Sequence, residues 1–185
     1  MGRSMSKKYE IFLDTLKKVG YLINDDYFNV KFSNESEDKG YEIKHRERVY
    51  CYELYHELRC SIGNVGPIIL HAEIDKTKHH IIKKNYKPDF VFHIPGEMED
   101  NFFIMEVKHI DNKKIMADTK KIIKFLKEYN YQYGIYLLFG TATERKIEII
   151  RKKIEVELEK EGIVKDRFYL AHHNNPREEI KIISI

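Results

Sequence analysis

Two apolar runs near the middle of the chain restrict its fold more than any other feature. They are FVFHI, residues 90–94, and FFIMEV, residues 102–107, and the turn-forming stretch IPGEMEDN joins them. Apolar runs of this length around a short turn predict an antiparallel β-hairpin, with strands at residues 88–94 and 101–108. Charged residues border both runs, which is unusual beside a buried strand unless these residues have partners or a function.

The order of the other expected elements predicts a mixed sheet. Three strands follow one another without a helix between them, whereas the later strands alternate with helices. This order predicts the α/β class, with a central mixed β-sheet flanked by helices on both faces. Residues 24–44 are polar and irregular, which predicts a loop or a short excursion. The expected helices are 7–19, 46–62, 113–129 and 143–161, and the expected strands are 68–75, 88–94, 101–108, 132–139, 166–172 and the terminal KIISI.

Length and composition are those of one globular domain. The chain has 185 residues, of which 42% are hydrophobic, and 33 basic residues against 30 acidic ones give a net charge of +3. Any basic surface must therefore be local. Cys51 and Cys60 form neither a metal-ligand spacing nor a disulfide framework, as expected in a reducing compartment. No run is apolar enough for a membrane span or a signal peptide, so we expect a cytoplasmic protein.

The charged residues around the hairpin are those that metal-assisted hydrolysis requires. Glu106 and Lys108 leave the same face of their strand about 7 Å apart, and a hairpin would bring Asp89 beside them. Two carboxylates and a backbone carbonyl are the ligands that Mg²⁺ accepts, and the ion then lowers the pKa of a bound water. A neighbouring lysine orients that water or stabilises the developing negative charge. These residues predict hydrolysis of phosphodiester bonds.

The same residues carry a resemblance to a known family. Pro88-Asp89, followed by Glu106-Val107-Lys108 at the end of an apolar strand, resembles the PD-(D/E)XK nuclease superfamily, the restriction-endonuclease-like phosphodiesterases. The αβββαβ core of that family has the order of elements predicted here. The resemblance covers a core of about residues 46–140 within a single domain, and the flanks 1–45 and 141–185 lie outside it.

The resemblance implies roles for individual residues. Asp89, Glu106 and the Val107 carbonyl would bind Mg²⁺ or Mn²⁺, and Lys108 would be the catalytic lysine. Many members add an acid from the helix before the first strand, and Glu53 is the first candidate. Glu57 on the same helix and Glu73 on the next strand are the alternatives. Residues 113–129 lack the Gln and Tyr pair of some exonuclease branches, so the branch of the family stays open.

Two lysine-rich segments are candidates for contacts with nucleic acid. Lys120 and Lys124 lie on the polar stripe of the helix at 113–129, and Lys83 and Lys84 end the segment TKHHIIKK. The first pair lies opposite the apolar stripe, so a solvated helix face is the simpler explanation of it. The resemblance implies DNA as the substrate, in restriction, repair, recombination or defence, and a possible homodimer.

Two other interpretations compete with a nuclease. One is a catalytically silent module of the same fold that binds nucleic acid or a protein partner, and the other is a structural protein whose charges form only ion pairs at a strand end. DNA against RNA, single against double strands, endo against exo cleavage and sequence specificity all stay open.

Overall fold

The centre of the molecule is a six-stranded mixed β-sheet. The computed structural model describes residues 2–33, 41–63, 68–72, 87–96 and 101–185. In spatial order the strands are β3 (Ile69–Ala72), β4 (Phe90–His93), β5 (Asn101–His109), β6 (Tyr133–Phe139), β7 (Phe168–His173) and β8 (Lys181–Ser184). β5, β6 and β7 run parallel, whereas the pairs β3–β4, β4–β5 and β7–β8 are antiparallel. The predicted mixed sheet and the predicted hairpin are therefore confirmed.

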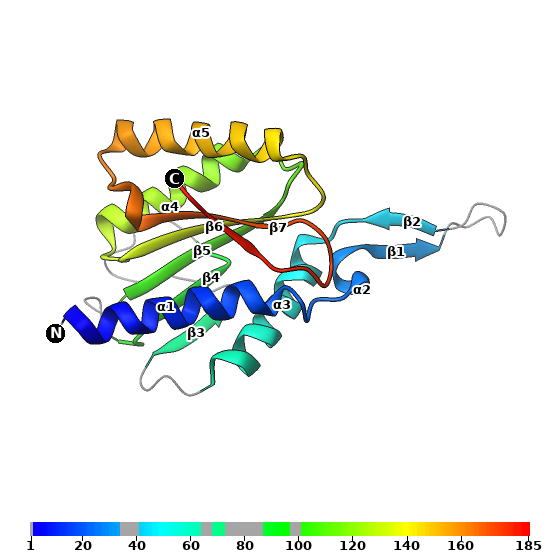
Figure 1. Cartoon of the computed structure of the whole chain (residues 1–185), viewed down its shortest axis with the longest axis horizontal. Coiled ribbons are helices and arrows are strands. Elements are labelled where there is room, and N and C mark those ends of the chain that lie inside the picture. The colour runs from blue at the N-terminus through cyan, green and yellow to red at the C-terminus, as the bar shows by residue number, and fades with distance from the viewer. Residues whose placement is uncertain (1, 34–40, 64–67, 73–86, 97–100) are drawn as a thin grey trace.

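Helices cover both faces of this sheet, so the molecule has three layers (Figure 1). One face carries α1 (Gly2–Val19), α2 (Asp25–Phe28) and α3 (Glu47–Ile62), and the other carries α4 (Ile115–Glu128) and α5 (Glu144–Glu161). A 3₁₀ turn, η2 (Lys165–Arg167), leads into β7. None of the described helices is both long and apolar enough to cross a membrane.

Successive side chains of β5 point alternately to the two helical layers. Met105 and Val107 lie in the apolar cluster with α1 and α3, whereas Ile104 lies in the cluster with α4 and α5. Because alternate residues share a face of a strand, Glu106 and Lys108 leave β5 on the α4 side. β5 lies between two other strands, so both charged residues start from the interior of the sheet.

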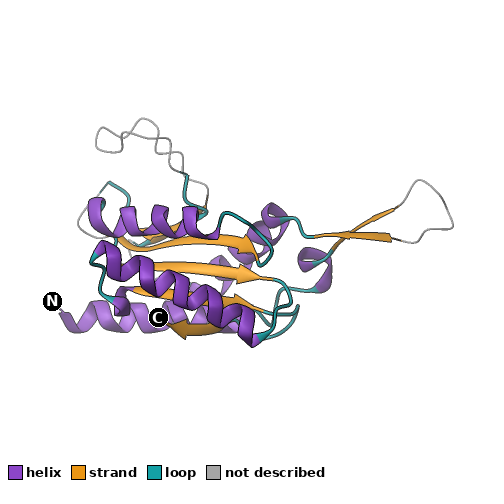
Figure 2. Ribbon diagram, turned by 90° about the horizontal axis from the view of Figure 1, so that it is seen from above, coloured by secondary structure: helices purple, strands orange, loops and turns teal. Residues whose placement is uncertain are grey.

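A two-stranded ribbon occupies part of the segment that was expected to be a loop or a short excursion. β1 (Val30–Ser33) pairs antiparallel with β2 (Tyr41–Lys44), and the ribbon extends away from the sheet (Figures 1 and 2). The sequence did not predict these strands, because they are short and no buried face imposes a hydrophobic alternation on them. Just after β2, the His45 ring stacks on the ring of His109 with 4.0 Å between centroids. The base of the ribbon therefore lies at the end of β5.

Gly134 sets the close approach of α4 to β6. A Cβ atom at this position would lie 2.3 Å from Cγ2 of Ile122, which is fully buried on α4. Neither the strand backbone nor the branched Ile122 side chain can yield easily in a packed core. The absent side chain at Gly134 thus allows α4 to lie against the sheet beside β5.

We expect Gly134→Ala to lower the free energy of unfolding by about 1–3 kcal/mol, because the added methyl overpacks the interface. An open site would give the opposite sign, since alanine in a strand is normally more stable than glycine. Urea denaturation measures the change. Val164→Ala, at a position that is 62% exposed, serves as the control and should stay within about 0.5 kcal/mol. An unchanged or increased stability of Gly134→Ala would contradict the close approach.

Candidate catalytic site

The ammonium group of Lys108 lies among three oxygen atoms. Its Nζ is 2.5 Å from Glu47 Oε1, 2.9 Å from the Val107 carbonyl oxygen and 3.3 Å from Asp89 Oδ2. The side chain is only 11% exposed. Burial alone would lower the pKa of Lys108, but Asp89 and Glu47 raise it above its ordinary value, so the amine stays protonated. This position at the end of β5 therefore holds a cation surrounded by oxygen.

The register of the hairpin brings Asp89 to this position. β4 and β5 pair Phe90 with Met105, and one further step along the register sets Asp89 opposite Glu106. The Asp89 carboxylate also accepts a hydrogen bond from the Val107 amide at 2.8 Å. This bond fixes the carboxylate against the backbone of β5, between Glu106 and Lys108. Three of the predicted site residues are thus adjacent.

Glu106 is buried and has a lysine of its own. Its side chain is 1% exposed, and Oε1 lies 2.7 Å from Nζ of Lys121 on α4. Lys121 also donates to the carbonyl oxygen of Lys87. Burial raises the pKa of Glu106 to about 8, with a further increase from Asp89, and this outweighs the opposing effect of Lys121. Near neutral pH the Glu106 carboxyl therefore holds a proton most of the time.

Two more polar groups approach the same cluster from α4 and β6. Asp118 feels the charges of Lys108 and Lys121, although burial still raises its pKa. Tyr136 is the partner of Glu106 in the parallel register of β5 and β6. Burial, and then the nearby Asp118, raise the pKa of the Tyr136 hydroxyl. Asp118 Oδ2 and the Tyr136 hydroxyl are both buried without a hydrogen-bond partner in the described part of the chain.

The acidic side chains and the Val107 carbonyl of this cluster fit a hard divalent cation. They offer carboxylate and carbonyl oxygens, the ligands that Mg²⁺ and Mn²⁺ prefer, and Oδ2 of Asp118 accepts no hydrogen bond in the described part of the chain. Among the described residues, no three His, Cys, Asp or Glu side chains form a ready metal-binding group. Asp89 and Glu106 are each paired with a lysine instead. Binding of a cation by these carboxylates therefore requires at least one ammonium group to move.

The acid of α3 that contacts Lys108 is Glu47, whereas the sequence singled out Glu53 as the ligand from this helix. Glu47 is the first residue of α3 and contacts Lys108 directly, and burial raises the pKa of its carboxyl. Within the described residues, Glu53 makes no hydrogen bond or ion pair with the cluster, and burial and its helix neighbour Glu57 raise its pKa. Glu73 lies outside the described residues. The prediction missed Glu47 because it considered only the interior of the helix, whereas the start of α3 meets the end of β5.

The predicted lysines on α4 lie on a different side of that helix from the cluster. Lys120 lies 3.6 Å from Glu157 on α5, and Lys124 lies 3.1 Å from Glu128 on α4 itself. Their charges are thus partly balanced within the α4–α5 layer. The neighbouring Lys121, which the sequence did not single out, is the lysine of α4 that enters the site. Lys83 and Lys84 lie outside the described residues.

We expect Glu106→Gln to stabilise the metal-free protein more as the pH rises. With a folded pKa of about 8 and an ordinary value of 4.5, the folded state retains a proton that the unfolded state has lost. The wild-type protein therefore loses stability from about pH 4.5 to about pH 8, and the glutamine variant does not suffer this loss. Melting temperatures in EDTA at pH 5 and pH 9 test this, with the exposed Glu128→Gln as control. An equal difference between variant and wild type at both pH values would contradict the raised pKa.

What the described residues establish is a buried set of carboxylates, two lysines and a tyrosine at the end of a central strand. The chain matches no protein-family model, no curated protein and no solved structure.

Proposed function

We propose that this chain is a divalent-metal-dependent nuclease that hydrolyses phosphodiester bonds. The observation that carries the proposal is the Lys108 ammonium group held by Asp89 and Glu47 beside the buried Glu106. A structural ion pair needs one acid for one lysine, whereas here four carboxylates approach two lysines in a buried site. The elements α3, β3, β4, β5, α4 and β6 follow one another in the αβββαβ order of a restriction-endonuclease-like core, which supports the proposal.

In this proposal Asp89, Glu106, the Val107 carbonyl and Glu47 hold Mg²⁺ or Mn²⁺. The bound ion supplies charge neutralisation at the phosphodiester and a water of lowered pKa. Glu106 has to give up its proton to become a ligand, so cation binding by this group is favoured at higher pH.

In this proposal Lys108 acts as a hydrogen-bond donor and not as a general base. Asp89 and Glu47 keep its amine protonated, so it can orient an attacking water or stabilise negative charge on the phosphoryl oxygens, but it has no lone pair with which to accept a proton. The Tyr136 hydroxyl, buried next to Glu106, is a second donor available to the same centre.

DNA is the proposed substrate, in the cytoplasm, and a homodimer would let two such sites cut both strands. These finer assignments depend on the family resemblance of Asp89, Glu106 and Lys108. The alternative is a catalytically silent module that binds nucleic acid or a protein partner. One observation favours this alternative, since Lys121 already pairs with Glu106 and the cluster can serve as a buried ion-pair network.

Nuclease assays with a Lys108→Ala variant test the proposed activity. We expect supercoiled plasmid or short oligonucleotides to be cut with Mg²⁺ or Mn²⁺ but not with EDTA, and the variant to lose at least about a hundredfold in rate. Lys152→Ala, on the exposed face of α5, should cut like the wild type. Circular dichroism confirms that each variant is folded. Cutting that survives in Lys108→Ala would remove this lysine from the mechanism.

Thermal shifts identify the ligands without depending on activity. At a Mn²⁺ concentration about ten times its Kd, binding should raise the Tm by roughly 3–6 °C, because the ion binds only the folded state. Asp89→Asn, Glu106→Gln and Glu47→Gln should each reduce or abolish this shift, whereas Glu53→Gln should keep it. A shift that depends on Glu53 and not on Glu47 would reverse the assignment of the α3 ligand. No shift in the wild type would leave the binding module as the better description.

A further inference from the structure

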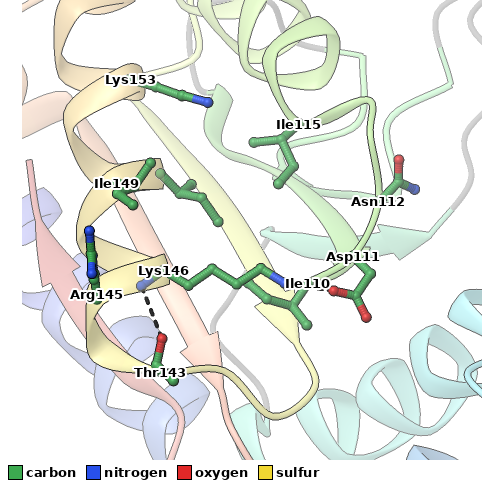
Figure 3. A pocket seen from close by; sticks show the side chains of 10 residues that line it. Ile110, Asp111, Asn112, Ile115, Thr143, Arg145, Lys146, Ile149 and Lys153 are labelled. Atoms are coloured by element: carbon green, nitrogen blue, oxygen red, sulfur yellow. Dashed lines mark hydrogen bonds and ion pairs between the residues drawn. The ribbon is translucent and has the colours of Figure 1, made fainter.

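A pocket of about 450 Å³ lies at the carboxyl ends of β5 and β6, next to the first half of α5 (Figure 3). Ile110, Asp111 and Asn112 line it from the segment after β5, and Ile115 lines it from the start of α4. Crevices at the carboxyl ends of parallel strands are the usual ligand sites of open α/β sheets. The volume lies within the range of small-molecule sites.

The pocket begins two residues beyond Lys108. The Ile110 amide donates to the Phe139 carbonyl at 2.9 Å, so the hydrogen bonds to β6 continue one residue beyond His109, the last residue of β5. Glu106, Lys108 and Ile110 therefore alternate along one extended segment and face the same helical layer. The pocket therefore adjoins the candidate catalytic site at the end of β5.

The α5 wall combines cations with an exposed apolar side chain. Lys146, Ile149 and Lys153 are three and four residues apart, so they share one face of the helix. Figure 3 shows Lys153 extending across the pocket toward Ile115 and Lys146 reaching toward Asp111. Ile149 is 48% exposed between the two lysines. A lone exposed isoleucine is ordinary. Here, however, the isoleucine lies between two lysines at a pocket, so this wall offers both apolar and positively charged contacts.

The charge of the pocket wall is positive. Arg145, Lys146 and Lys153 are the basic residues that line it, and Asp111 is the single acid among the lining residues. Lys146 contacts that acid at 2.6 Å and holds the pKa of Asp111 below its ordinary value. The N-terminus of α5, capped by Thr143, adds the positive end of an 18-residue helix. Phosphate is the chemical group that such a set of donors favours.

We propose that this pocket binds an unpaired nucleotide of a single-stranded segment that flanks the scissile phosphate, with its phosphate on Lys153 and Lys146 and its base against Ile149. This assignment rests on the proposed function of the neighbouring cluster. A base can enter a pocket and lie on an apolar surface only when it is unstacked, which a regular duplex does not allow. The pocket thus selects substrates with single-stranded segments over blunt duplexes.

Binding in EDTA tests the pocket separately from cleavage, because no metal-dependent cutting occurs there. The probe is a short fluorescein-labelled oligothymidylate, and fluorescence anisotropy gives its Kd with the full chain. Ile149→Asp should raise this Kd at least tenfold. Lys153→Ala should weaken binding and reduce the slope of log K against log salt by about 0.7, the value for one phosphate contact on a single strand.

Each variant has a matched control on the same helix. Val156→Asp places the same charge at a position that is 64% exposed and does not line the pocket, and Lys152→Ala removes the adjacent lysine, whose side chain is 68% exposed. Both controls should bind like the wild type. A labelled blunt duplex should bind the wild type and the pocket variants equally.

The results separate this proposal from the proposed function. If the wild type does not bind the oligothymidylate, or if Ile149→Asp binds it as well as Val156→Asp does, the pocket is not a nucleotide site, whether or not plasmid is cut. If binding depends on Ile149 and Lys153 but no substrate is cut with Mg²⁺ or Mn²⁺, the nucleotide site stands and the nuclease fails. Loss of duplex binding in the same variants would overturn the selectivity for single strands.

Discussion

The charge balance around β5 is the constraint on which the rest of this site depends. Lys108 and Glu106 leave a central strand that is buried as far as Lys108, and a buried cation without a partner costs several kcal/mol. The partners come from both helical layers. Glu47 reaches Lys108 from the start of α3, and Lys121 reaches Glu106 from α4. The positions of the helices relative to the sheet are therefore tied to the chemistry of the cluster, and the close approach of α4 at Gly134 is part of the same arrangement.

The mixed direction of the strands explains why so many polar groups meet at one edge. β4 is antiparallel to β5, so the residue that precedes β4 lies near the end of β5, and Asp89 meets Glu106 there. β6 is parallel to β5, so the segments that follow both strands leave at this same edge and form the pocket beside α5. A sheet with only parallel strands would have placed Asp89 at the opposite edge. The candidate catalytic site and the pocket thus follow from one feature of the topology.

The sequence predicted the parts of this arrangement that depend on local pattern. The apolar alternation located the strands and helices, and the short turn paired β4 with β5, which was enough to bring Asp89, Glu106 and Lys108 together. It did not predict Glu47, Asp118 or Lys121, because their roles depend on where α3 begins and how α4 crosses the sheet. Lys120 and Lys121 are adjacent residues of the same type, so the sequence does not distinguish them. The packing of α4 on the sheet decides that Lys121 faces Glu106. The ribbon at β1 and β2 was missed because its short strands bury no regular apolar face.

The parallel pairing of β5 with β6 also determines at which stage of synthesis and folding this cluster can form. The hairpin of β4 and β5 is a local contact, but Lys121 and Tyr136 follow it in the chain, and β6 can join β5 only after α4 has crossed the sheet. Contacts between distant segments form late, because closing the chain between them costs entropy. During synthesis the ribosome therefore releases β5 before the residues of α4 and β6 that complete the cluster have been made. A nascent chain that stops short of β6 carries Glu106 and Lys108 without Tyr136, so the complete site belongs to the finished domain alone.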